Sequence, residues 1–505
     1  MPADSSDTST ITKRSASGKT PVQSVPSTDP TLSPQQSNHL SDAGNQSNDH
    51  YKSRLSPFRY KLRSLLLPII RSETKVLHKL QTSLRHPLLD YYFAWTANLA
   101  SHTFYVLMLP PPIWFGASKL SRDLVYVLGL GIYFSGALKD YFCLPRPRSP
   151  PLHRITMSSY TTQEYGFPSS HSANATAVSL ILLSKLIEIK SALSTSKLYV
   201  LLFALFVYYV SLIFGRLYCG MHGVLDIAIG SLIGVACFSF RYFYGTQWDL
   251  MLFDNFLNDW ITPVLIIGFY LLLIHIHSEP IDDCPCFDDS VSFIGVLLGL
   301  DLSHYVAFKS KYFVNRNAFQ DPLLINFEYS ELGWVKTALR FVLGVTLVVI
   351  WKAVSKPIIF TILPPIYKFI GVSLPRRNFI PTAETEKSTR QIRSTSISND
   401  QSKIGDFNNL IKGFTDHSKR DEIGPETEID YYAILDYNQD KRKRKKSNAA
   451  ENAEVAAQLE SFLQKGNVFK PRYDVETIGR TMVYAGVSTT TVWGFSVFSE
   501  LFNLN

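Results

Sequence analysis

The first 56 residues contain scarcely any large apolar side chains. They are rich in Ser, Thr, Pro, Gln and Asn, a composition that cannot bury enough apolar surface to order the backbone. The same stretch lacks an apolar run of signal-peptide length, so membrane insertion depends on a later segment. We therefore expect residues 1–56 to form a disordered N-terminal tail.

Cysteine is also scarce. The chain of 505 residues has five, namely Cys143, Cys219, Cys237, Cys284 and Cys286. They show no metal-ligand spacing with histidine, and one intervening proline leaves Cys284 and Cys286 too close for an unstrained disulfide. The sequence thus predicts neither a zinc site nor a disulfide framework.

Long apolar blocks separated by short polar loops dominate the remaining sequence. A helix needs ~20 apolar residues to cross the hydrocarbon. Candidate spans fall near 88–110, 121–142, 173–190, 197–215, 223–243, 258–276, 290–308, 335–353, 356–373 and 478–502. The predicted fold class is an all-α integral membrane protein, a helical bundle of about nine or ten spans.

Two segments outside these spans differ from them in composition. Residues 57–86 mix a short apolar run with basic side chains, which is typical of an interfacial amphipathic helix; a membrane crossing there, and with it the side of the N-terminus, is left open. Residues 375–475 are polar, carry a Lys/Arg run at 441–446 and form an insertion that we expect in the cytosol. The remaining predicted parts are a membrane core at 87–243, additional transmembrane helices at 244–374 and a C-terminal transmembrane helix at 476–505.

Ionisable residues gather in three clusters at the ends of the predicted spans. In the first, Lys139 ends a span, and Arg146 follows between two prolines that stiffen the loop and hold its side chain in place. In the second, Ser169, Ser170 and His171 stand at the start of a span. Helix-terminal N–H groups and serine hydroxyls there offer hydrogen bonds to an anion such as phosphate.

The third cluster runs from Arg216 through His222 to Asp226. His222 and Asp226 are four residues apart and therefore share one face if the segment is helical. A carboxylate on one ring nitrogen fixes the tautomer and leaves the other nitrogen as a nucleophile. Two histidines with three cations favour phosphoryl transfer.

Each signal alone has an ordinary structural explanation. A Ser-Ser-His at a helix start is usually a cap, and cations at span ends are usually interface anchors. The pair of His222 and Asp226 is as often a structural contact as a site. The three clusters together, in fixed order at one membrane face, indicate a phosphoryl-transfer site specifically, although no single cluster does.

The combined pattern resembles the type 2 phosphatidic acid phosphatase superfamily, over about residues 120–245. The matching residues are Lys139, Arg146, Pro147, Pro168, Ser169, His171, Arg216, His222 and Asp226. Within that superfamily, LKDYFCLPRPRSPP, YGFPSSHSANA and GRLYCGMHGVLD most resemble sphingosine-1-phosphate phosphatases, fungal long-chain-base members included. Two positions depart from the family pattern: Ser170 replaces a common glycine, and Gly215 replaces a common serine.

The resemblance implies a six-helix catalytic core and a metal-independent reaction without cofactors. In it, His222 attacks phosphorus to give a phosphohistidine, His171 acts as general acid and then base, and Asp226 orients His222. Substrate phosphate is bound by Lys139, Arg146, Ser169, Ser170 and Arg216. No metal-binding residues are expected, and the sequence lacks the carboxylate cluster that magnesium-dependent transfer uses.

The implied function is hydrolysis of a sphingoid long-chain-base 1-phosphate to the free base and phosphate, in sphingolipid metabolism. The alternatives are a broad lipid phosphate phosphatase acting on phosphatidic acid, a headgroup transferase, or a non-catalytic membrane transporter or scaffold. The expected partners are the lipid phosphate and the bilayer, because a net charge of +8 alone does not indicate nucleic acid. Protein partners, oligomeric state and the preferred base are left open.

Loop charges suggest which way the protein faces. On the side of the three clusters, the loop 277–289 carries Glu279, Asp282, Asp283, Asp288 and Asp289. On the other side lie Lys119, Arg122, Lys190, Lys197, Lys309, Lys311 and Arg316. The positive-inside rule then makes the catalytic face non-cytosolic. The resemblance suggests the endoplasmic reticulum membrane, with the site facing the lumen.

Overall fold

The fold is that of a computed structural model. It describes residues 43–157, 163–253, 260–282, 284–309, 327–370, 472–502 and 504, and within these it contains helices and no strands. The elements in chain order are α2 (Asn48–Lys52), α3 (Pro57–Leu84), α4 (Pro87–Thr96), η1 (Ala97–Ala100), α5 (His102–Met108), α6 (Pro111–Trp114), α7 (Ser118–Phe142), α8 (Ser170–Glu188), η3 (Lys190–Ala192), α9 (Thr195–Tyr218), α10 (Val224–Phe253), α11 (Ile261–Ile276), α12 (Cys286–Lys309), α13 (Tyr329–Ile370), α18 (Val475–Thr489), η5 (Thr490–Gly494) and α19 (Phe495–Leu501).

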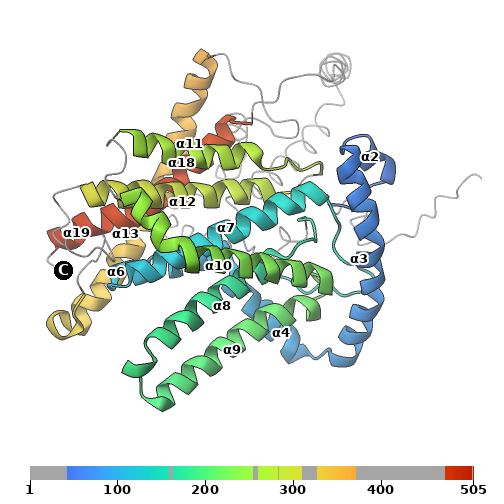
Figure 1. The fold of residues 1–505 in the computed structure, drawn as a ribbon, viewed down its shortest axis with the longest axis horizontal. Helices are drawn as coiled ribbons and strands as arrows, with labels where there is room; N and C mark the ends of the chain where they lie inside the picture. The colour runs from blue at the N-terminus through green and yellow to red at the C-terminus, as the bar shows by residue number, and fades with distance from the viewer. Residues whose placement is uncertain are drawn as a thin grey trace, which may run out of the picture.

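Most of the long helices form a bundle whose members run across the view in alternating directions, between two ends (Figure 1). We call the end that holds the C-terminus of α7 and the N-termini of α8, α10 and α12 the motif end. Close helix packing is visible at glycines: a Cβ on Gly230 would approach the Ser169 carbonyl oxygen at 2.3 Å, and one on Gly234 would approach that of Ala173 at 2.3 Å. Glycine there lets α8 and α10 approach backbone to backbone, as small residues do in membrane bundles.

The protein is a multi-pass membrane protein. In the described part of the chain, four helices are long and apolar enough to cross a membrane, namely Thr195–Tyr218, Val224–Leu252, Cys286–Ala307 and Tyr329–Tyr367. The all-α membrane fold is therefore confirmed, while the expected total of about nine or ten spans stays a prediction.

Several of the expected spans differ in form. The stretch 88–110 is divided into α4, η1 and α5 instead of forming one helix. The stretch 335–353 and the described part of 356–373, up to Ile370, belong to a single helix, α13, which continues through Pro357, Pro364 and Pro365. One helix thus stands where two crossings were predicted, so the described residues from Arg472 onward begin on the opposite side from that expectation.

Residues 371–471, and with them nearly all of the predicted insertion 375–475, lie outside the described residues. Their described neighbours both lie at the motif end: Tyr367 donates through its hydroxyl to the Tyr473 carbonyl at 2.9 Å, and Arg472 donates to the Ile274 carbonyl at the end of α11, at 3.2 Å. The described residues on either side of the insertion thus lie at the motif end, where two spans would have placed them at the opposite end.

Helix α3 lies across the motif end, roughly at right angles to the long helices (Figure 1). Arg59 donates to the Asp140 carbonyl at 2.8 Å, and Gln81 donates to the Tyr218 carbonyl at 2.9 Å, so α3 reaches from the end of α7 to the end of α9. The segment 57–86, predicted as interfacial, thus forms a helix that packs over the ends of α7 and α9 at the motif end of the bundle.

The stretch predicted to be a tail contains structure near its end. Tyr51 of α2 is fully buried and donates to Asp282 Oδ2 at 2.6 Å. The Arg63 guanidinium lies 3.7 Å over the Tyr51 ring. These contacts attach residues 43–56 to the loop before α12. The buried aromatic ring of Tyr51 explains why this part is structured, although its polar composition predicted disorder. Residues 1–42 lie outside the described chain.

Cys284 and Cys286 form a disulfide in this same loop, where the sequence predicted none. The turn around the intervening proline leaves their Cα atoms 5.5 Å apart, which is within the range that disulfides span.

A buried ionic network closes the opposite end of the bundle. Arg241 binds Asp123 at 2.6 Å and Asp249 at 2.6 Å, and Arg122 binds Asp249 at 3.0 Å. All four side chains are buried. Removing one partner from such a network typically costs about 3–5 kcal/mol, so it ties α7 to α10 strongly.

Candidate active site

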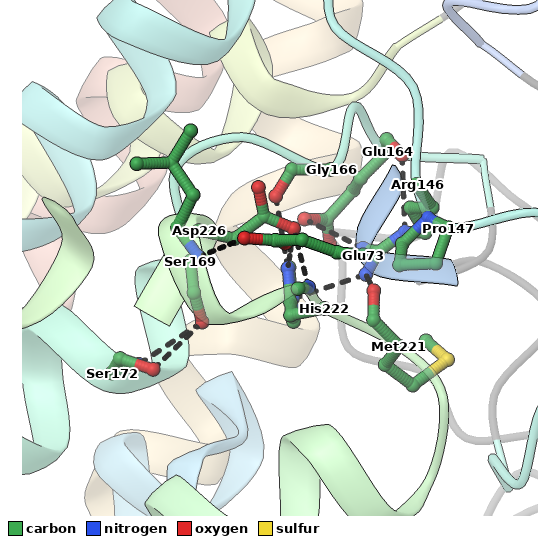
Figure 2. Close-up of polar contacts among 12 residues, drawn as sticks. Glu73, Arg146, Pro147, Glu164, Gly166, Ser169, Ser172, Met221, His222 and Asp226 are labelled. Carbon is green, nitrogen blue, oxygen red and sulfur yellow. Dashed lines mark hydrogen bonds and ion pairs between the residues drawn. The ribbon is translucent and has the colours of Figure 1, made fainter. Parts of the chain in front are cut away.

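The three motif clusters meet at the motif end of the bundle. Lys139 stands in the last turn of α7, Arg146 in the following loop, and Ser169 immediately before α8. His222 lies in the loop between α9 and α10, and Asp226 in the first turn of α10. The fold therefore brings together the residues that the sequence singled out, and Figure 2 shows several of them in contact.

His222 is held by two neighbours of opposite hydrogen-bonding character. Its Nε2 lies 3.1 Å from Arg146 Nη1, and its Nδ1 lies 2.9 Å from the Gly166 carbonyl oxygen. A guanidinium can only donate and a carbonyl can only accept. The proton must therefore be on Nδ1, which leaves the lone pair on Nε2.

The surroundings also keep His222 uncharged. The residue is 1% exposed, and burial lowers its pKa well below the ordinary 6.5. The positive charges of Arg146, Lys139 and Arg216 lower the pKa further. Buried imidazole near cations loses its proton readily, so the ring is neutral and nucleophilic at neutral pH.

Asp226 plays a different part from the one that the i, i+4 spacing predicted. Because α10 begins at Val224, His222 precedes the helix and does not lie on its face. Asp226 Oδ2 accepts from the Gly223 N–H at 2.8 Å and is 3.7 Å from His222 Nδ1. The carboxylate thus closes the turn that carries His222, while the Gly166 carbonyl holds the ring directly (Figure 2).

Lys139 and Arg146 share one carboxylate that the sequence analysis did not single out. Lys139 Nζ is paired with Glu164 Oε2, and Arg146 Nη2 lies 3.5 Å from the same oxygen. The Arg146 Nε also donates to the Glu164 carbonyl at 3.1 Å. Burial lowers the pKa of Arg146 to about 10, so the guanidinium remains charged at neutral pH.

The start of α8 faces the same place. The Ser169 hydroxyl accepts from the Ser172 N–H at 3.3 Å and so caps the helix. Ser170 Oγ lies 3.4 Å from Lys139 Nζ. A cavity beside them is lined by Lys139, Glu164, Ser170, His171 and Asp289. The first-turn N–H groups of a helix attract anions, which suits a phosphate beside Ser170 and His171.

Arg216 supports the site through its backbone as well as its charge. Its carbonyl accepts from the Met221 N–H at 3.1 Å, which fixes the loop that carries His222. The preceding Gly215, where the family commonly has serine, packs against α4: a Cβ there would lie 2.9 Å from Cδ1 of Phe93. Close packing against an aromatic ring gives this departure a physical reason.

Glu73 of α3 is a second residue that sequence reasoning missed. Its Oε1 accepts from the Leu225 N–H at 3.0 Å, at the N-terminus of α10 beside Asp226. Burial raises the pKa of Glu73 above its ordinary value. No local pattern could have revealed this contact, because more than 150 residues separate the partners in sequence.

A metal centre has little support among the described residues. The candidate cluster consists of Asp140 with Cys284 and Cys286. The two cysteines are joined in the disulfide and so offer no thiolate.

The segment that contains these residues is similar to known proteins. The profile of the PAP2 superfamily matches residues 121–249, the span from α7 to α10. The chain is 42% identical over 334 residues to a dihydrosphingosine 1-phosphate phosphatase of Saccharomyces cerevisiae, an alignment that covers 65% of this chain and 78% of that protein. It is 37% identical over 340 residues to a dihydrosphingosine 1-phosphate phosphatase of Schizosaccharomyces pombe, covering 66% and 77%.

More distant relatives have similar names. A sphingosine-1-phosphate phosphatase 2 of Homo sapiens is 30% identical over 232 residues, covering 44% of this chain and 54% of that protein. A lipid phosphate phosphatase delta of Arabidopsis thaliana is 28% identical over 337 residues, covering 64% and 76%. None of the solved structures matches the chain significantly.

Fold and site together define a multi-pass membrane enzyme of the lipid phosphatase class, with a histidine held among cations at one end of a helical bundle. The chain belongs to the PAP2 superfamily, and the similarity extends beyond the 121–249 core to relatives of which it covers more than three quarters.

Proposed function

We propose that this protein hydrolyses sphingoid long-chain-base 1-phosphates to the free base and inorganic phosphate, through a phosphohistidine on His222. The observation that carries the mechanism is the tautomer of His222, with Nδ1–H directed to Gly166 and the Nε2 lone pair held among cations. The names of the two yeast relatives support the substrate class.

In the first step, the Nε2 lone pair attacks phosphorus, the P–N bond forms and the bond from phosphorus to the C1 oxygen breaks. Arg146, now beside Nε2, exchanges this contact for a non-bridging phosphate oxygen. Lys139 and Arg216 neutralise the other oxygens, and Ser169, Ser170 and the first N–H groups of α8 supply directed hydrogen bonds. His171 gives its proton to the departing alkoxide.

In the second step, water attacks phosphorus while neutral His171 takes its proton. The P–N bond breaks, phosphate leaves, and the electron pair returns to His222 Nε2. Asp226 acts as a positioning residue through the Gly223 turn. The scheme needs no metal, because the three cations supply the charge that stabilises the phosphoryl group.

The test is phosphate release by the purified full chain in detergent with EDTA, comparing wild type with His222→Ala. Dihydrosphingosine 1-phosphate and phosphatidic acid are offered in matched mixed micelles. We expect metal-independent release that favours the sphingoid phosphate, with a loss of about 10³-fold or more in the variant, as for removal of a nucleophile.

His78→Ala is the matched control, because His78 is an exposed histidine of α3, and it should retain full activity. Equal release from both lipids would instead assign a general lipid phosphate phosphatase. Retention of activity in His222→Ala would refute the phosphohistidine mechanism.

We further propose that the protein lies in the endoplasmic reticulum membrane with the site facing the lumen. The compartment is supported by the family resemblance. The orientation is supported by loop charge, since Lys190 and Lys197 flank the short α8–α9 connection at the end away from the motifs, while Glu279 and Asp282 lie in the loop at the motif end. Helix α3 also brings basic residues to the motif end, so the orientation is tested by glycosylation mapping. Modification of an acceptor in the 277–285 loop supports a lumenal site. No modification there, together with modification at 190–197, would mean that the site faces the cytosol.

A further inference from the structure

A carboxylate stands among the cations that we assign to phosphate binding. Glu164 is 8% exposed and pairs with Lys139 and Arg146 through the same oxygen. Its charge also acts on Arg216. The mechanism described above does not use Glu164, and a negative group close to a phosphate site would by itself weaken binding of a phosphate dianion.

The proposed substrate offers an explanation for this carboxylate. A sphingoid base 1-phosphate carries its phosphate on C1 and an ammonium group on the adjacent C2. When the phosphate enters a site formed by three cations, the ammonium must follow it to within a few ångströms. Three like charges nearby would repel it in this buried place, unless a carboxylate is present to bind it.

Glu164 lies where such an ammonium would arrive. It lines the same cavity as Lys139, Ser170 and His171, next to the start of α8. Asp289, the second buried carboxylate of this cavity, comes from the first turn of α12 and acts electrostatically on Glu164. The cavity therefore offers the ammonium of Lys139 and the N-terminus of α8, and the two carboxylates lie beside them.

We propose that Glu164 determines specificity by binding the C2 ammonium of the sphingoid base after the substrate's phosphate has displaced it from Lys139 and Arg146. The inference rests on the proposed function and identifies the C2 ammonium as the feature of the substrate that the site recognises. Before substrate binds, Glu164 neutralises part of the buried cation cluster. Once phosphate takes over Lys139 and Arg146, the Glu164 carboxylate gains the ammonium as a partner. Phosphatidic acid brings no such cation, so its phosphate replaces the contacts of Glu164 with Lys139 and Arg146 without offering a new one.

The experiment compares two substrates that share a chain and a phosphate and differ in the nitrogen substituent at C2. Dihydrosphingosine 1-phosphate carries the ammonium, and N-acetyl-dihydrosphingosine 1-phosphate has a neutral amide. The ratio of their kcat/KM values is measured for wild type and for Glu164→Gln, as full chains in the same micelles. We expect wild type to favour the charged substrate by about tenfold or more, which is what a charge-assisted contact contributes, and the variant to lose most of this preference.

Glu188→Gln is the matched control, because it makes the same chemical change at an exposed residue at the far end of α8. Glu164→Asp keeps the charge and should retain part of the preference. The wild-type ratio is measured independently of any variant, so a variant that fails to fold does not remove the test.

Two results would overturn the inference while leaving the proposed function intact. One is a wild-type enzyme that hydrolyses both substrates equally well. The other is a Glu164→Gln enzyme that loses activity on both by the same factor, which would make Glu164 only a positioning residue for Lys139 and Arg146. Failure of wild type to hydrolyse the charged substrate at all would refute the proposed function and the inference with it.

Discussion

At the scale of single residues, the site depends on which atoms can donate and which can accept. His222 is oriented by a backbone carbonyl, which can only accept a hydrogen bond, and by an arginine, which can only donate one. The single side chain of Arg146 contacts His222, Glu164 and the Met221 carbonyl. A lysine could reproduce its charge but not this set of directed contacts.

The lowered pKa of His222 predicts the pH dependence. His222 must be unprotonated to attack phosphorus, and burial together with Arg146 moves its protonation well below pH 6.5. The free enzyme therefore keeps its nucleophile as the pH falls through 6.5 and loses it only at lower pH. The measurement is the pH profile of kcat/KM, with the substrate's own phosphate ionisation determined by ³¹P NMR in the same micelles. An acid limb at 6.5 that the substrate does not explain would contradict this prediction.

At the scale of elements, the turn before α10 is stabilised from outside by α3. Glu73 accepts from Leu225 N–H at 3.0 Å, and its second carboxylate oxygen is buried without a hydrogen-bond partner among the described residues. Negative charge at a helix N-terminus is favourable. An interfacial helix thus supports the first turn of the helix that carries Asp226.

Replacing Glu73 with alanine should therefore weaken both stability and catalysis. Loss of a capping acceptor costs about 1 kcal/mol, which lowers the melting temperature by about 2–4 °C in a domain of this size. We also expect kcat to fall, because the turn of His222 and Asp226 loosens. Glu73→Gln keeps an acceptor for Leu225 and is the comparison variant; it should stay closer to wild type in thermal unfolding and phosphate release. Equal losses in both variants would show that charge, not the hydrogen bond, matters.

At the scale of the whole molecule, helix direction decides which segments share a side of the membrane. Helix α13 runs towards the motif end, and α18 starts there, as the pairs of Tyr367 with Tyr473 and of Trp351 with Val483 show. The catalytic loops and both attachments of the 371–471 segment therefore face the same compartment.

This arrangement predicts the outcome of topology mapping. Glycosylation acceptors inserted into the 277–285 loop and directly after residue 370 should both be modified or both remain unmodified in the same membranes. An acceptor in the α8–α9 connection, at the opposite end of the bundle, is the internal control and should behave in the opposite way. Modification of only one of the first two acceptors would mean that α13 spans the membrane differently from the structure.

Much of this could be predicted from the sequence because it depends on local chemistry. Apolar blocks long enough to cross a bilayer predict helices, and eight of them fall on the described helices α7 to α13, one on each helix and two on α13. The motif residues from Lys139 to Asp226 indicated phosphoryl transfer before any fold was known. The stretches predicted as separate spans on either side of residue 354 lie in one helix, because α13 continues through Pro364 and Pro365, which membrane helices tolerate where neighbouring groups satisfy the freed backbone.

The sequence by itself determined the membrane class, the order of the helices and the motif cluster in which we propose the nucleophile, because these follow from composition and from short motifs. Only the tertiary structure decided that Gly166 orients His222, that Glu164 enters the cation cluster and that Glu73 caps α10. These are contacts between segments distant in sequence or between a side chain and a backbone carbonyl. Their formation depends on how helices pack, which no local pattern specifies.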